Sequence, residues 1–150
     1  REKQIDITND LKIVELDIKS SLLSLEYTIY YYINNYKLQL IDSFVIGFSQ
    51  GGMIAFELGN YLKNRLGAIG IISSKIISKN KIINNNLKNT PIFISHGDKD
   101  NVLSINDFYK SLDFLKNNNC YFESYKILND DHTISENTIK LLQKFIKKNL

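Results

Sequence analysis

The sequence predicts an α/β fold in which a mostly parallel sheet is covered by helices on both faces. Short continuous apolar runs recur along the chain without polar alternation, which is typical of strands buried on both faces of a parallel sheet. Segments with apolar residues at steps of three and four separate these runs, as amphipathic helices do. A length of 150 residues with 43% hydrophobic content fits a single domain spanning residues 1–150.

The first half of the chain begins with a long predicted helix. Its apolar stripe starts at Val14, and the helix is expected to end near Asn34. A strand follows at residues 43–48, a helix begins near Met53, and a second strand occupies residues 67–72. Residues 75–90 are mostly polar and predict an irregular connection. The first helix also carries four tyrosines that we expect to find in the core or at its rim, rather than on a surface for stacking bases or sugars: Tyr27, Tyr30, Tyr31 and Tyr32.

The second half repeats the alternation of strand and helix. A strand is predicted at residues 91–96, with a loop at 97–100 behind it. Ser104 stands three residues before Asp107, in a pattern similar to a capping box, and starts the next helix. A fourth strand at about 121–128, a loop at 129–133 and a final helix from near Ser135 complete the chain.

Charge and composition argue against several classes of partner. The 19 basic and 16 acidic side chains give a net charge of +3 without a basic stripe or a reading module, so we expect no nucleic-acid partner. Cys120 is the only cysteine, which excludes an internal disulfide and a Cys-x-x-Cys site and fits a cytoplasmic protein. The apolar runs are too short to predict a membrane span, and nothing indicates an oligomeric state.

The segment from Gly47 to Gly51 matches the pattern Gly-x-Ser-x-Gly and lies between a predicted strand and a predicted helix, as a nucleophile elbow requires. Ser49 is therefore the candidate nucleophile. We expect side chains at Gly47 and Gly51 to collide with neighbouring backbone in so sharp a turn. The N–H of Gln50, at the start of the helix, is a candidate donor to an oxyanion.

The base follows from chain order, since hydrolases with this elbow present Ser, then Asp or Glu, then His along the chain. The sequence has two histidines, His96 and His132. His132 follows the last strand and is the candidate base. His96 precedes the candidate acids, and we expect it to have a structural, hydrogen-bonded role.

The residues alone do not identify the catalytic acid. Asp98 and Asp100 both lie in the loop after the third strand, and their spacing alone does not decide between them. Asp130 and Asp131 lie directly before His132 in the chain, where adjacent side chains rarely face each other, so we expect both to be solvated.

Three segments together resemble the phospholipase/carboxylesterase family of the α/β-hydrolase fold, which includes acyl-protein thioesterases. They are Gly-Phe-Ser-Gln-Gly-Gly at 47–52, His-Gly-Asp-Lys-Asp-Asn-Val at 96–102 and His-Thr-Ile-Ser at 132–135. The resemblance implies that Asp100 is the catalytic acid. It further implies a serine esterase that acts on small carboxylic esters, thioesters or acylated substrates through an acyl-enzyme, with no metal or organic cofactor.

The sequence also departs from this family. Ser104 stands where proline is usual, Asp131 replaces the glycine that commonly precedes the histidine, and the N-terminal strands with their His-Gly loop, the source of a second oxyanion donor, are not found. We therefore expect an N-terminally truncated chain holding the C-terminal two-thirds of the fold. The alternatives are a non-catalytic remnant of such an enzyme, or a dienelactone-hydrolase-like or peptidase-like member of the fold. Ser at position 49 instead of Cys, and the short chain, count against the last two.

Overall fold

A computed structural model describes residues 7–77 and 82–150 of the chain. In these residues the centre is one sheet of four parallel strands, whose order in space follows the order in the chain. The strands are β1 (Phe44–Phe48), β2 (Ala68–Ile72), β3 (Ile92–Gly97) and β4 (Phe122–Ile127). Since parallel strands all run the same way, their carboxyl ends meet at one edge of the sheet.

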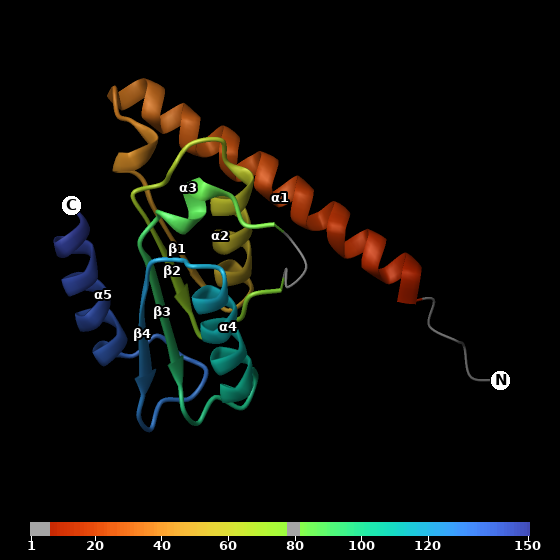
Figure 1. The fold of residues 1–150 in the computed structure, drawn as a ribbon, viewed down its shortest axis with the longest axis vertical. Coiled ribbons are helices and arrows are strands. Elements are labelled where there is room, and N and C mark those ends of the chain that lie inside the picture. Colours follow the sequence, from red (N-terminus) through yellow and green to blue (C-terminus); the bar gives the residue numbers. More distant parts are fainter. Residues whose placement is uncertain (1–6, 78–81) are drawn as a thin grey trace.

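Helices cover both faces of the sheet (Figure 1), as the sequence predicts. On one face lie α2 (Gln50–Tyr61), which packs on β1 and β2, and α4 (Ile105–Asn117), which packs on β3. The long helix α1 (Ile7–Tyr36) packs on the outside of α2, and α5 (Glu136–Asn149) covers the opposite face of β2 and β3. Two short helices, η1 (Leu40–Asp42) and α3 (Asn85–Lys88), lie in connections.

The two central strands explain why the apolar runs show no polar alternation. Every residue of β2 and β3 is buried. Ile69 and Ile71 join the core that lies beneath the α1, α2 and α4 layer, while Ile72 joins Phe93 and Phe145 in the second core beneath α5. Because successive side chains of a strand point to opposite faces, a strand between two cores is mainly apolar on both faces, and the polar residues of β3, Ser95 and His96, come only near its carboxyl end.

Two expected boundaries differ from the structure. Helix α2 starts at Gln50, directly after the turn, rather than near Met53. The connection expected to be irregular contains α3, which begins with the Asn84 side chain accepting a hydrogen bond from the N–H of Leu87 at 2.7 Å. Residues 78–81 of that connection lie outside the described residues.

The tyrosines of α1 lie mainly at the rim. Tyr30 packs against the core, whereas Tyr27, Tyr31 and Tyr32 are each more than half exposed. Across residues 7–77 and 82–150, no helix has the length and apolar character that crossing a membrane requires.

Candidate active site

Ser49 occupies the sharp turn between β1 and α2. Its backbone angles, φ 53° and ψ −121°, are ones that residues other than glycine seldom adopt. Holding the backbone in this conformation costs about 1–3 kcal/mol. Hydrogen bonds hold both sides of the residue. Its N–H donates to the carbonyl oxygen of Ile72 at 2.9 Å, and its own carbonyl oxygen accepts from the N–H of Gly52 at 3.0 Å. The turn leaves the Ser49 side chain partly exposed beyond the carboxyl end of β1.

The glycines of the turn have different roles. A Cβ atom on Gly47 would lie 2.1 Å from the carbonyl carbon and oxygen of Gly51, so any side chain at position 47 is excluded. The prediction that a side chain at Gly51 would collide with neighbouring backbone is wrong. A Cβ atom there would meet no atom within 4 Å outside its own turn of helix. Gly52 is the second constrained glycine, since its Cβ would lie 2.7 Å from that of Ser74.

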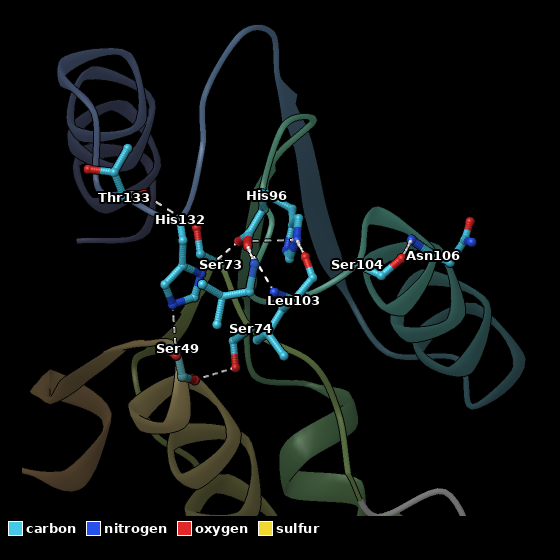
Figure 2. A network of polar contacts seen from close by, with 11 residues as sticks. Ser49, Ser73, Ser74, His96, Leu103, Ser104, Asn106, His132 and Thr133 are labelled. Atoms are coloured by element: carbon cyan, nitrogen blue, oxygen red, sulfur yellow. Dashed lines mark hydrogen bonds and ion pairs between the residues drawn. The ribbon is translucent and has the colours of Figure 1, made fainter.

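His132 comes from the loop after β4 and reaches Ser49 across the carboxyl edge of the sheet (Figure 2). Its Nε2 lies 3.0 Å from Oγ of Ser49, and its ring packs against Phe48 with centroids 4.8 Å apart. The loop can come this close because residue 97 is glycine. A Cβ on Gly97 would lie 2.4 Å from the carbonyl oxygen of Asp130.

Asp100 lies on the other side of the imidazole. Its Oδ2 is 2.7 Å from Nδ1 of His132, and its Oδ1 accepts from the N–H groups of Val102 and Leu103, both at 2.9 Å. The carboxyl group is fully buried. Burial by itself would raise the pKa of Asp100, but the hydrogen bonds from His132, Leu103 and Val102 favour the charged form and together hold the pKa below its ordinary value.

These contacts determine which nitrogen of His132 carries the proton. The ionised carboxylate of Asp100 can only accept, so Nδ1 of His132 must donate to it. In the neutral imidazole, Nε2 is then an acceptor and faces the hydroxyl of Ser49. The arrangement is therefore ready to take a proton from Oγ of Ser49.

The start of α2 offers a place for negative charge. Gln50 is the first residue of the helix, so its N–H has no partner within the helix, and the helix dipole favours an anion at this end. No acidic residue lies in the first turn.

Gly47 and Gln50 also line a cavity of about 690 Å³ between β1, α2 and the middle of α1, with Ile18, Ser21 and Val45 among its walls.

The remaining candidate residues make other contacts. Asp98 accepts from the N–H of Asn129 at 2.7 Å and so joins the loops after β3 and β4. Asp131 is exposed, as expected, but Asp130 is partly buried, with an Oδ2 that finds no partner among the described residues. His96 is buried in β3, and its Nε2 lies 2.9 Å from the carbonyl oxygen of Leu103.

Two neighbouring serines after β2 also contact the site, and no sequence pattern indicates them. The hydroxyl of Ser74 donates to the carbonyl oxygen of Ser49 at 2.5 Å, and that of Ser73 donates to the carbonyl oxygen of Thr133 at 3.3 Å. One short segment thus contacts both the turn that presents Ser49 and the loop that presents His132. In the part of the chain that the structure describes, no three His, Cys, Asp or Glu side chains are grouped so that they could hold a metal ion.

Comparison with known proteins identifies relatives of the chain in sequence and in structure. A curated relative, carboxylesterase SOBER1 of Arabidopsis thaliana, is 30% identical over 112 residues, which are 71% of this chain and 48% of the relative. The chain therefore spans about half the length of that relative.

Solved structures show the same fold. The crystal structure of SOBER1 matches with a TM-score of 0.81 at 23% identity, over 88% of this chain and 64% of the other. The Bacillus cereus carboxylesterase matches with a TM-score of 0.79 at 19% identity, over 91% of this chain and 63% of the other. Residues 4–150 match the family described as Phospholipase/Carboxylesterase. With nearly the whole chain matched in sequence and the fold matched in structure, the chain belongs to the phospholipase/carboxylesterase family and has the α/β-hydrolase fold.

Proposed function

We propose that the protein is a serine hydrolase that cleaves carboxylic esters or thioesters through an acyl-enzyme, as carboxylesterases, lysophospholipases and acyl-protein thioesterases do. One observation carries the proposal. A continuous chain of hydrogen bonds links Ser49 to His132 at 3.0 Å and His132 to Asp100 at 2.7 Å. Membership of the family supports the same class of reaction.

Acylation follows from the protonation states derived above. As Oγ of Ser49 attacks the carbonyl carbon of the substrate, Nε2 of His132 takes the hydroxyl proton. Asp100 keeps the ring oriented and stabilises the imidazolium. The negative charge passes to the former carbonyl oxygen, to which the N–H of Gln50 donates a hydrogen bond. When the tetrahedral intermediate collapses, the alcohol or thiol leaves with the proton from Nε2, and the acyl group remains on Ser49.

Deacylation uses the same groups in reverse. Water gives a proton to Nε2 of His132 and adds to the acyl carbon. The second tetrahedral intermediate then expels Oγ of Ser49, which recovers its proton, and the carboxylic acid is released. All bonds and protons are accounted for by the substrate, one water molecule and the three side chains.

Labelling with a fluorophosphonate tests the proposal without a known substrate, because the reagent reacts with activated serines. We expect labelling of the protein to be abolished in Ser49→Ala, and to be at least about a thousandfold slower in His132→Ala because the proton acceptor is lost. Ser104→Ala is the matched control. Ser104 caps α4 by accepting from the N–H of Asn106 at 3.1 Å, so its loss should affect stability and leave labelling intact.

The proposal fails if the folded protein is not labelled, or if labelling survives Ser49→Ala. If labelling is confirmed, hydrolysis of aryl esters and of aryl thioesters with acyl chains of increasing length would determine the substrate class. The wall of the cavity beside Gln50 is the first place to look for the determinant of chain length.

A further inference from the structure

His96 lies in β3 beside Asp100, outside the chain of hydrogen bonds that joins Ser49 to Asp100. Its side chain is fully buried, and its ring stacks on Phe108 with centroids 5.7 Å apart. Its Nε2 lies 2.9 Å from the carbonyl oxygen of Leu103 (Figure 2) and 3.5 Å from Oδ2 of Asp100. Its Nδ1 is buried with no hydrogen-bond partner among the described residues.

The surroundings of His96 place a proton on Nε2. A carbonyl oxygen and an ionised carboxylate oxygen both only accept, so the nitrogen that faces them must donate. The bond to Leu103 at 2.9 Å has ordinary length, and the distance of 3.5 Å to Asp100 is that of a weaker electrostatic contact. His96 therefore presents one N–H to both groups.

Leu103 is held from two sides. Its N–H donates to Oδ1 of Asp100, and its carbonyl oxygen accepts from His96. The same carboxylate binds Nδ1 of His132 through Oδ2. A loss of the bond from His96 would release the carbonyl of Leu103, and with it one of the two N–H groups that fix the carboxylate of Asp100.

We propose that His96 is a positioning residue: it anchors the loop at residues 100–103, so that Asp100 keeps its orientation toward His132. The inference deepens the proposed function and rests on it. A small rotation of the carboxylate would lengthen the 2.7 Å bond to Nδ1 and remove the preference of His132 for the tautomer that can accept the proton of Ser49.

The informative variant is His96→Phe, which keeps a ring against Phe108 but has no N–H. His96→Gln is the conservative variant, because its amide can donate near the position of Nε2. Ile92→Val is the control. Ile92 is fully buried in the same strand, and loss of one methylene there lowers stability by removing packing alone.

Two measurements are needed on each variant below its unfolding temperature: the ¹⁵N resonances of the His132 ring, which report the fraction of molecules with the proton on Nδ1, and the rate of fluorophosphonate labelling. In His96→Phe we expect a mixture of tautomers and labelling at least about tenfold slower, since small misplacements of catalytic groups have effects of this size. His96→Gln should regain most of the rate, and Ile92→Val should match the parent in both measurements.

An unchanged tautomer ratio in His96→Phe would overturn the inference, as would equal effects of Ile92→Val. If His96→Phe does not fold, His96→Met serves in its place, because it is apolar, adaptable in shape and lacks a donor. The two proposals fail separately. Absence of labelling in the parent protein contradicts the proposed function, whereas the tautomer of His132 still reports whether His96 fixes Asp100.

Discussion

Asp100→Asn separates the orientation of His132 from the rest of the site. Oδ1 of Asp100 accepts two backbone N–H groups at 2.9 Å, from Val102 and Leu103, so the amide oxygen of Asn must take this place. The amide nitrogen then occupies the position of Oδ2, 2.7 Å from Nδ1 of His132. Because an amide nitrogen only donates, Nδ1 must accept and the ring proton moves to Nε2, where it faces Ser49.

An imidazole with its proton on Nε2 cannot accept the proton of Ser49. The equivalent change of tautomer in a Ser-His-Asp triad lowers turnover by about 10⁴-fold, which corresponds to about 5.5 kcal/mol of activation free energy. We expect a loss of this size in the second-order rate constant for fluorophosphonate labelling. Thermal unfolding measured on the same samples would show that the variant is folded.

Asp98→Asn is the matched control. It removes the same charge two residues away, and its amide oxygen can still accept the N–H of Asn129 as Asp98 does at 2.7 Å. We expect labelling within about threefold of the parent. A rate for Asp100→Asn within tenfold of the parent, in folded protein, would refute the argument from the tautomer. An equal loss in Asp98→Asn would assign the effect to charge alone.

Three further predictions concern stability and reactivity. Gly47→Ala should lower the free energy of unfolding by about 3 kcal/mol or more, because the added Cβ would lie 2.1 Å from the backbone of Gly51. Gly51→Ala should change the free energy of unfolding by less than about 1 kcal/mol. Equal melting temperatures of the two variants would contradict the steric argument. The stability that comes from the lowered pKa of Asp100 is complete above the ordinary carboxyl pKa, near 3.9, and is lost as the pH falls through the lower value. Asp100→Asn should therefore flatten the plot of melting temperature against pH below about pH 4, and an unchanged plot would show that Asp100 is not the group responsible. Burial raises the pKa of the Cys120 thiol, so its alkylation by iodoacetamide at neutral pH should be slower than that of an exposed model thiol, and an equal rate would show that the thiol is accessible and ionises normally.

The order of elements could be predicted because it depends on local patterns. The runs at residues 67–72 and 91–96 are mainly apolar because β2 and β3 lie between helical layers. The run at 43–48 is apolar too, although β1 is only partly buried. The candidate positions of Ser49 and His132 also followed from the chain, since each comes after a strand and carboxyl ends of parallel strands meet at one edge. The choice of Asp100 over Asp98 did not follow from spacing and came from the family resemblance. The start of α2 was misplaced because Gln50 and Gly51 have no apolar side chain to extend the helical stripe.

The residues that hold the loops of the site in place could not be predicted from local patterns. Ser74 contacts a residue 25 positions away in the chain and Ser73 one that is 60 positions away, and each serine acts on a backbone carbonyl that any residue type would offer. The need for glycine at position 97 comes from the close approach of the carbonyl of Asp130, in a loop that begins after the next strand. Such requirements arise only when distant loops meet, so no spacing within the sequence expresses them.

Two strained residues at the ends of adjacent strands show how the site is prepared before a substrate arrives. Ser49 after β1 has φ 53° and Ser73 after β2 has φ 45°, and each conformation costs about 1–3 kcal/mol. The N–H groups of both residues donate to carbonyls at the ends of neighbouring strands, Ile72 and Ser95, each at 2.9 Å. A third bond, from Ser74 to the carbonyl of Ser49, ties the two turns together. At about 0.5–1.5 kcal/mol each, these bonds offset much of the strain, and their partners are fixed by the sheet. The nucleophile and the N-terminus of α2 therefore keep their relative positions without help from a ligand, which is the condition under which a donor such as the N–H of Gln50 stabilises an oxyanion without further reorganisation.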